Sequence, residues 1–375
     1  MRILIIGEFS SFSKNLSTGF RALGHECFVF SWGDGFKKID EDGAHYSVCY
    51  KIEEVRHFFS YKRLINRYNY YCSSIKLRKF VNSLKSKEKW DVVLVINPVF
   101  LKRNPFDIFF SQRMIFSLVG SKENIFLSAC GGDVPFYDYW SVKKWKNWEL
   151  INYKKKDALS DKSIRHFKRC ASFINKVIPV AYDYAEAWRK SKYAKSFRVY
   201  PTIPLPVDPS GFNVINEING RIVVFHGITR PEEKGTSYII KAMDRLHEKY
   251  PEKVECVAKG GLPLKEYLSL MDRANIVIDQ TFSVGGGMNA LYALSKGKVL
   301  LGGNEPENAN EYGTDSDSIP IINILPDSDQ IFNQLERLIL NPKEIMRLSL
   351  LGRTYVEMVH DSRKIASMYI DIFQN

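Results

Sequence analysis

A stretch near the middle of the chain combines an apolar strand, two cations and the start of a helix. Residues 222–225 are Ile-Val-Val-Phe, Arg230 and Lys234 follow in a polar segment, and Gly235 precedes a helical apolar stripe. Cations beside a helix N-terminus suit a dianion, because the free amide groups and the side chains carry positive charge. The stretch therefore predicts a diphosphate site at a turn from strand to helix.

A second turn of the same kind follows about 50 residues later. Gly285, Gly286 and Gly287 lie between the apolar run 276–279 and a helical pattern at 288–295. Glycines let the backbone approach a phosphate or a sugar, and the helix start offers amide donors. A flexible turn without a ligand is the alternative. Two such turns in one half of the chain indicate a nucleotide-diphosphate site, and so a transferase of an activated group.

Strand and helix patterns alternate in both halves of the 375-residue chain, which predicts α/β domains with parallel sheets. Four prolines between residues 201 and 209 indicate a linker. We expect two doubly wound Rossmann-like domains, at residues 1–205 and 206–355. A last helix within residues 356–375 is expected to pack back on the first domain.

The charge is unevenly distributed along the chain. Residues 1–205 hold 36 Lys and Arg against 19 Asp and Glu, and the remainder holds 18 against 23. This asymmetry predicts an anionic partner for the first half. No nucleic-acid-binding signature is found, so we expect no nucleic acid partner. An anionic membrane surface that contacts the basic, aromatic stretches 51–89 and 141–176 is the expected partner, and solvated helix faces are the alternative.

Composition also bears on localisation and on metals. No apolar run approaches the roughly 18 residues of a membrane-spanning helix, and the N-terminus resembles a core strand more than a signal peptide. We expect a cytoplasmic protein, attached peripherally to the inner face of the cell membrane. The six cysteines are scattered, which is typical of reduced thiols. No convincing Asp-x-Asp motif is found, so no metal is expected.

Two motifs resemble a known family. The residues Gly227, Arg230 and Lys234-Gly235, together with Ala293-Leu-Ser-Lys-Gly-Lys-Val299, resemble the retaining group-4 glycosyltransferases of bacterial surface-polysaccharide clusters. The resemblance implies the GT-B fold, in which two Rossmann-like domains face a central cleft. It also implies a metal-independent, hexosyltransferase-like enzyme with a nucleotide-diphosphate sugar as donor and no other cofactor. Its acceptor would be a saccharide or lipid-linked saccharide in capsule, lipopolysaccharide or glycoconjugate synthesis.

The resemblance also implies site residues. Arg230 and Lys234 would offset charge on the leaving nucleoside diphosphate. Asp133, which follows a strand of the first half, would orient or deprotonate the acceptor hydroxyl, and a helix cap is its alternative role. The expected donor-binding residues are Gly7, Gly227, Arg230, Lys234, Gly235, Gly285, Gly286, Gly287, Asn289 and Tyr292.

One departure from the family pattern concerns the sugar and the ribose. Members of the family carry two glutamates eight positions apart, where this chain has Val284 and Tyr292. Valine offers no polar group and tyrosine only a phenol, so neither replaces a carboxylate. Asn289 is a candidate for the missing polar contact. A GT-B protein without catalysis, acting as a binding or assembly partner, is therefore the main alternative function. A GT-B epimerase is a third alternative, without the carboxylates that it would need.

Overall fold

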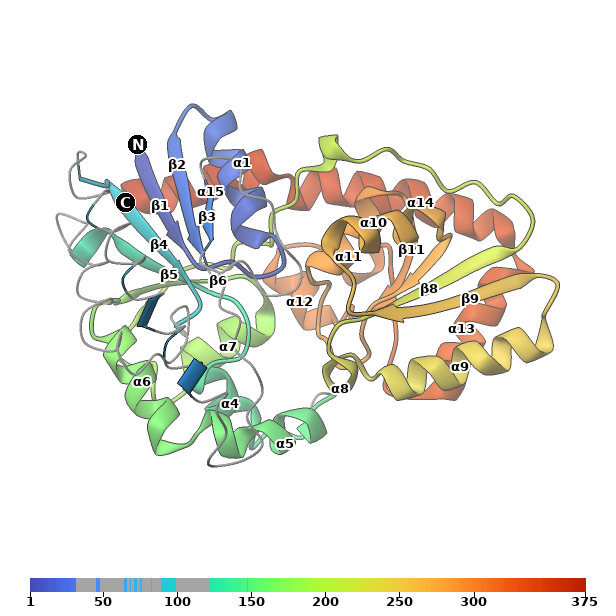
Figure 1. Cartoon of the computed structure of the whole chain (residues 1–375), viewed down its shortest axis with the longest axis horizontal. Coiled ribbons are helices and arrows are strands. Elements are labelled where there is room, and N and C mark those ends of the chain that lie inside the picture. Colours follow the sequence, from blue (N-terminus) through green and yellow to red (C-terminus); the bar gives the residue numbers. More distant parts are fainter. Residues whose placement is uncertain are drawn as a thin grey trace.

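The computed structural model describes residues 1–31, 45–47, 89–98, 122–146 and 148–375, with isolated positions between 64 and 82. The described strands form two parallel sheets in two lobes (Figure 1). The first sheet has the order β3-β2-β1-β4-β5-β6-β7 and the second the order β12-β11-β10-β8-β9. In both sheets the order reverses beside a central strand, which is typical of doubly wound folds.

The first sheet is buried on both faces. Its strands are β1 (Arg2–Ile6), β2 (Glu26–Ser31), β3 (His45–Ser47), β4 (Val92–Ile96), β5 (Ile125–Ala129), β6 (Lys176–Pro179) and β7 (Arg198–Val199). Described helices of this half are α1 (Phe12–Ala22), α4 (Val134–Trp140), α5 (Trp148–Ala158), α6 (Asp161–Ala171) and α7 (Tyr182–Lys190). Ile3 packs in one apolar cluster with Leu16 of α1, whereas Leu4 packs in another with Trp188 of α7. Helices therefore cover both sides.

The second sheet has the same construction. Its strands are β8 (Ile222–Ile228), β9 (Val254–Gly260), β10 (Ile276–Ile278), β11 (Val299–Gly302) and β12 (Ile321–Asn323). Its helices are α8 (Pro231–Lys234), α9 (Thr236–Lys249), α10 (Leu264–Arg273), α11 (Met288–Ser295), α12 (Pro306–Glu311), α13 (Ser328–Leu340) and α14 (Pro342–Tyr355). Val224 packs with Ile239 of α9, and Phe225 packs on the other face with Tyr267 of α10.

The chain passes between the two lobes twice, and the two passages pair with each other. The Val207 amide donates to the His360 carbonyl at 2.8 Å, and the Ser362 amide donates to the Val207 carbonyl at 2.9 Å. A π-helical turn at Val356–His360 then leads into α15 (Ser362–Gln374), which Asp361 caps. Helix α15 packs against α1 in the first lobe, as Figure 1 shows. Both termini of the chain therefore belong to one lobe.

The predicted fold class, two doubly wound α/β domains, is confirmed. The helical stripe expected after Gly235 and the helical pattern expected at 288–295 coincide with α9 and α11. The segment expected as a polar loop differs, because its residues 231–234 form the short helix α8. Proline at the first helical position favours such a turn, since its fixed φ angle suits a helix and its missing amide costs no hydrogen bond there.

The two basic stretches differ in what the structure describes. Residues 51–89 lie almost entirely outside the described residues, whereas 141–176 contains α5 and α6. Phe167 and Cys170 of α6 are buried, and Lys162, Arg165 and Lys168 are exposed on its opposite side. In the described part of the chain, no helix combines the length and the apolar character needed to cross a membrane.

The contact between α1 and α15 leads to a first prediction. A Cβ atom at Gly19 would lie 2.0 Å from the Ser362 carbonyl oxygen and 2.9 Å from the Ala366 Cβ. Gly19→Ala should therefore push α15 off α1 and lower the free energy of unfolding by about 1–3 kcal/mol in urea denaturation. Gly211→Ala is the matched control, because nothing lies within 4 Å of its Cβ position. Equal midpoints for the two variants would contradict the prediction.

Candidate active site

Two adjoining pockets lie between the carboxyl ends of the two sheets. The Lys234 pocket is lined by Lys234, Tyr267, Asp279, Asn289 and Tyr292, with Ser11 from the first lobe. The interdomain pocket is lined by Gly131, Asp183 and Tyr184 of the first lobe and by the glycine turn 285–287 of the second. Both pockets share Ser10, Thr229, Arg230, Gln280, Gly287 and Met288. The structure thus brings together residues from both predicted anion-binding turns.

Lys234 is held in a buried ion pair. Its Nζ lies 2.7 Å from Asp279 Oδ1, and both side chains are only 4% exposed. The same carboxylate oxygen accepts a hydrogen bond from Asn289 Nδ2 at 2.8 Å, and Tyr267 donates its hydroxyl to Asn289 Oδ1. Burial alone would raise the pKa of Asp279, but the charge of the Lys234 ammonium and the hydrogen bonds from Lys234 and Asn289 hold it below its ordinary value. The positive charge of Lys234 is therefore largely neutralised.

Arg230 differs from Lys234 in having an exposed side chain. It precedes α8 and lines both pockets. Within the described residues, its guanidinium makes no hydrogen bond and no ion pair. A guanidinium offers five donors in a planar fork that matches a phosphate. Of the two predicted cations, Arg230 is the one that can bind an anion without losing a protein partner.

The glycine turn leads into α11 at the junction of the two pockets. Gly287 is the N-cap of this helix, and the first intrahelical bond runs from the Leu291 amide to the Gly287 carbonyl at 3.1 Å. The amides of Met288, Asn289 and Ala290 therefore have no acceptor within the helix. Side chains at 285 would not fit, because a Cβ there would lie 2.4 Å from Asn308 Nδ2. This helix start therefore presents free amide donors, which suit an anion, at the junction of the two pockets.

Three other predicted donor-binding glycines have roles in packing and backbone geometry. Gly235 adopts φ 66°, and a Cβ there would lie 2.1 Å from Thr281 Oγ1. A Cβ at Gly227 would lie 2.1 Å from the Tyr267 hydroxyl. Gly7, at φ 108°, accepts a hydrogen bond from Ser13 Oγ through its carbonyl. None of the three lines either pocket, and their assignment to donor binding stays a prediction.

The first lobe contributes the loop between β1 and α1. The Glu8 carboxylate accepts hydrogen bonds from the Ser13 and Lys14 amides and so caps α1. Ser10 and Ser11 follow with φ angles of 55° and 70°. Left-handed backbone is costly for residues with a side chain and is often found at functional sites. Here it turns both serines toward the Lys234 pocket.

The two positions that depart from the family pattern are buried. Val284 is 1% exposed, and its carbonyl accepts a hydrogen bond from the Glu305 amide. The Tyr292 hydroxyl accepts from Asn15 Nδ2 at 3.1 Å, which joins α11 to α1 across the lobes. Burial raises the pKa of Tyr292 to about 12. Tyr292 thus lines the pocket, but its hydroxyl already has a partner in the other lobe.

Asp133 has its alternative role, that of a helix cap. One carboxylate oxygen accepts from the Phe136 amide at 2.9 Å, and the other accepts from Trp188 Nε1 at 3.0 Å. Burial raises its pKa to about 7, against these two hydrogen bonds. Asp133 is 4% exposed and lines neither pocket, and its predicted contact with the acceptor stays a prediction that these contacts do not support. The proline at the second helical position agrees with a cap.

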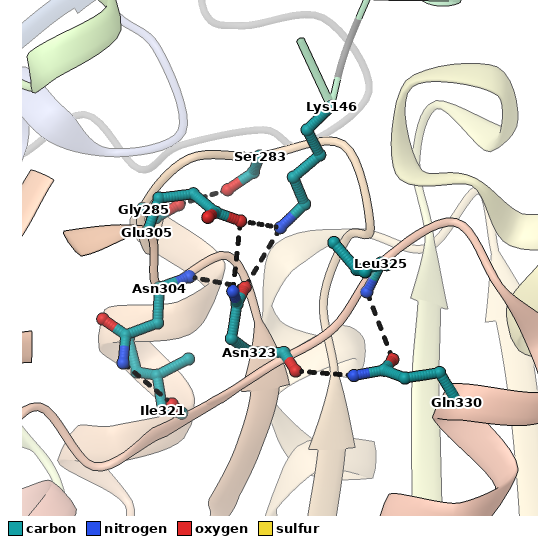
Figure 2. Close-up of polar contacts among 9 residues, drawn as sticks. All are labelled: Lys146, Ser283, Gly285, Asn304, Glu305, Ile321, Asn323, Leu325 and Gln330. Atoms are coloured by element: carbon teal, nitrogen blue, oxygen red, sulfur yellow. Dashed lines mark hydrogen bonds and ion pairs between the residues drawn. The ribbon is translucent and has the colours of Figure 1, made fainter. Parts of the chain in front are cut away.

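Sequence reasoning missed a contact between the lobes beneath the glycine turn. Figure 2 shows Lys146, from the segment before α5, reaching Glu305 Oε1 at 2.9 Å and Asn323 Oδ1 at 3.1 Å. Asn323 Nδ2 donates to the same Glu305 oxygen at 3.1 Å. Burial lowers the pKa of Lys146, and Glu305 opposes this shift. No local pattern distinguishes Lys146 from the other lysines of its basic stretch, because its partners lie more than 150 residues away.

No protein-family model matches the sequence, and no curated protein matches it significantly. Solved structures match along the whole chain. Sucrose-phosphate synthase from Thermosynechococcus elongatus has a TM-score of 0.62 at 12% identity, covering 100% of this chain and 98% of that one. Anabaena HepE in complex with UDP has a TM-score of 0.56 at 13% identity, with full coverage of both chains. WaaG, a glycosyltransferase involved in lipopolysaccharide biosynthesis, has a TM-score of 0.54 at 13% identity, covering 100% of this chain and 99% of that one.

These similarities concern the fold. The chain has the GT-B fold of these structures, as expected from the sequence. In this fold two doubly wound domains present the carboxyl ends of their strands to a common cleft. The two pockets described above occupy that place.

The buried ion pair leads to a second prediction. Lys234→Met leaves the Asp279 carboxylate buried without its cation, which should lower the free energy of unfolding by roughly 3–5 kcal/mol. Arg230→Ala removes the neighbouring exposed cation and should change the free energy of unfolding by no more than about 0.5 kcal/mol. Urea denaturation of both variants at neutral pH measures the difference. If Lys234→Met unfolds at the same urea concentration as the wild type, the ion pair between Lys234 and Asp279 does not stabilise the fold.

Proposed function

We propose that the chain is a glycosyltransferase that moves a sugar from a nucleotide-diphosphate sugar to a hydroxyl group. The observation that carries the proposal is the junction of the two pockets, where the unpaired Arg230 guanidinium of the described cleft meets the first-turn amides of α11. A diphosphate seated there would be bound by both. The remaining space of the interdomain pocket would take the sugar and the acceptor.

The neighbouring structures support a nucleotide-sugar donor. HepE is recorded with UDP and with UDP and glucose, and an α-glucosyltransferase with UDP-glucose and DNA containing an abasic site. The last has a TM-score of 0.60 at 10% identity. In this chain, Leu262, Leu264 and Tyr267 form the apolar wall of the Lys234 pocket, which suits a nucleoside. UDP is therefore the first nucleotide to test.

The proposed mechanism uses electrostatics and no metal. As the bond between the sugar and the diphosphate breaks, negative charge grows on the leaving oxygen. Arg230 and the N-terminus of α11 would stabilise this charge more in the transition state than in the ground state. Lys234 would contribute less than the sequence suggests, because Asp279 neutralises it. Retention of configuration is proposed from the family resemblance.

A binding partner without catalysis is the second candidate function. Val284 and Tyr292 favour it, since neither position supplies the carboxylate that the family uses for the sugar and the ribose. In this alternative the diphosphate part of the site would remain, and a nucleotide would bind without turnover.

The acceptor and the location follow from charge. We propose that the acceptor is a saccharide or lipid-linked saccharide of surface-polysaccharide or glycoconjugate synthesis. We also propose that the protein is cytoplasmic and binds this acceptor at an anionic membrane surface. The exposed cations of α6, together with Lys143, Lys144 and the 79% exposed Tyr153, support attachment. Cations beside exposed aromatic side chains suit an interface of anionic headgroups.

Nucleotide binding is the direct test. Titration calorimetry with UDP, GDP and their sugar conjugates should give saturable binding, and Arg230→Ala should weaken it about 10–100-fold, as loss of a charge-assisted hydrogen bond predicts. Arg221→Ala is the matched control, because this exposed arginine precedes the opposite end of the same strand β8. It should bind as the wild type does.

The outcomes separate the two candidate functions. Binding followed by release of nucleotide from the sugar conjugate supports the transferase. Binding without turnover, with or without saccharide acceptors, supports the second candidate. If none of the nucleotides binds, both proposals fail.

Membrane attachment is tested by sedimentation with vesicles. The wild type should pellet with vesicles of phosphatidylglycerol and phosphatidylcholine at low salt, and less at high salt because ions screen the attraction. Reversing Lys162, Arg165 and Lys168 to glutamate should abolish pelleting. The control reverses three exposed lysines of the second lobe, Lys241, Lys265 and Lys343, and should pellet normally. Equal pelleting of both triple variants would refute attachment through α6.

A further inference from the structure

Two carboxylates line the described pockets, and they differ in their partners. Asp279 in the Lys234 pocket is paired with Lys234. Asp183 lines the interdomain pocket and has no ion pair among the residues that the structure describes. One of its oxygens accepts a hydrogen bond from the Tyr184 amide at 3.0 Å. The rest of that carboxylate is available to a group in the pocket.

The backbone at Asp183, at the start of α7, is held in place by aromatic side chains. Trp140 Nε1 donates to the Asp183 carbonyl at 2.8 Å. Trp140 stacks on Trp145 with ring centroids 4.6 Å apart, and Trp145 contacts the Tyr182 ring edge-on at 5.7 Å. These aromatic contacts fix the backbone that carries the carboxylate, so little entropy would be lost when a ligand binds.

Asn308 connects the start of α7 to the glycine turn. Its Oδ1 accepts a hydrogen bond from the Tyr182 amide at 3.1 Å, across the boundary between the lobes. Its Nδ2 lies so close to Gly285 that a Cβ there would be 2.4 Å away. Asn308 is 5% exposed. One buried side chain thus sets the spacing between Asp183 and the turn that precedes α11.

We propose that Asp183 is the catalytic residue that holds the acceptor hydroxyl and takes its proton, and that Asn308 is its positioning residue. This inference rests on the proposed glycosyl transfer. The acceptor oxygen forms a bond to the anomeric carbon on the face that the diphosphate leaves, which retains the configuration, while the bond from that carbon to the diphosphate breaks. The nucleoside diphosphate leaves with the electron pair, and the hydroxyl proton passes to the Asp183 carboxylate and then to water. Asp133 cannot do this, since its two oxygens cap α4 and bind Trp188.

The surroundings of Asp183 suit this role. Phe9, Val180, Leu205 and Val284 make much of the pocket wall apolar. Burial raises the pKa of Asp183 to about 7, and the hydrogen bond from the Tyr184 amide opposes the rise. The polar and charged groups that face it are Tyr184 on its own helix, Tyr312 after α12 and Arg230 across the pocket. A carboxylate with such a pKa is a base matched to neutral pH.

The test compares Asp183→Asn with Glu186→Gln, which removes a carboxylate from the same helix outside both pockets. Nucleotide release is measured with the sugar conjugate that binds in calorimetry, with and without saccharide acceptors. Asp183→Asn should lower kcat about 100–10,000-fold and leave nucleotide binding and the melting temperature nearly unchanged. The wild-type rate should rise with pH through about 7, where the carboxylate deprotonates, and this rise should vanish in the variant. Glu186→Gln should keep both the rate and the rise.

The positioning role has its own readout. Asn308→Ala should lower kcat about 10-fold, as loss of one hydrogen bond predicts, and keep the rise with pH. Asn308→Asp keeps the oxygen that accepts from Tyr182 and should restore most of the rate. If the wild type turns over and Asp183→Asn keeps its rate and pH profile, this inference fails while the transferase proposal stands. If the wild type binds nucleotide without turnover, both fail.

Discussion

The arrangement of the cleft depends on the pairing between the two passages of the chain from lobe to lobe. Val207 is hydrogen-bonded to both His360 and Ser362, and His360 Nδ1 lies 2.8 Å from the Leu205 carbonyl oxygen. Burial lowers the pKa of His360 to about 4, so the ring is neutral at neutral pH and its Nδ1 can donate. These contacts seat α15 against α1 and leave the carboxyl ends of both sheets facing each other. The loops after the strands meet for this reason.

Residues of the same charge differ in whether the fold already supplies their partners. Two cations lie close together in sequence, but Lys234 is neutralised by Asp279, whereas Arg230 faces the cleft. Two aspartates of the first lobe differ in the same way, since Asp133 caps α4 and Asp183 lines the interdomain pocket. Burial raises the pKa of both aspartates, but only one can reach a ligand. Position relative to the pocket, more than charge, separates side chains bound up in the fold from those open to a ligand.

Local patterns predicted the elements well. The helices at 236–249 and 288–295 and the glycine turn were found because periodicity and glycine spacing are properties of neighbouring residues. The packing roles of Gly227 and Gly235 were not predicted, because the contacts that require glycine there come from Tyr267 and Thr281. Asp183 was overlooked for a similar reason. Its position depends on the hydrogen bond between Tyr182 and Asn308, which are 126 positions apart, and no local pattern contains such a contact.

The sequence by itself determined the alternation of strands and helices, the two lobes and the two turns suited to a diphosphate. Each of these follows from hydrophobic periodicity and from backbone freedom over a few residues. Only the tertiary structure decided which cation is neutralised, which aspartate is a cap and which helix start faces the cleft. Those outcomes depend on side chains from distant segments that compete for the same few hydrogen bonds in a buried space. Packing of the whole chain decides which of them meet.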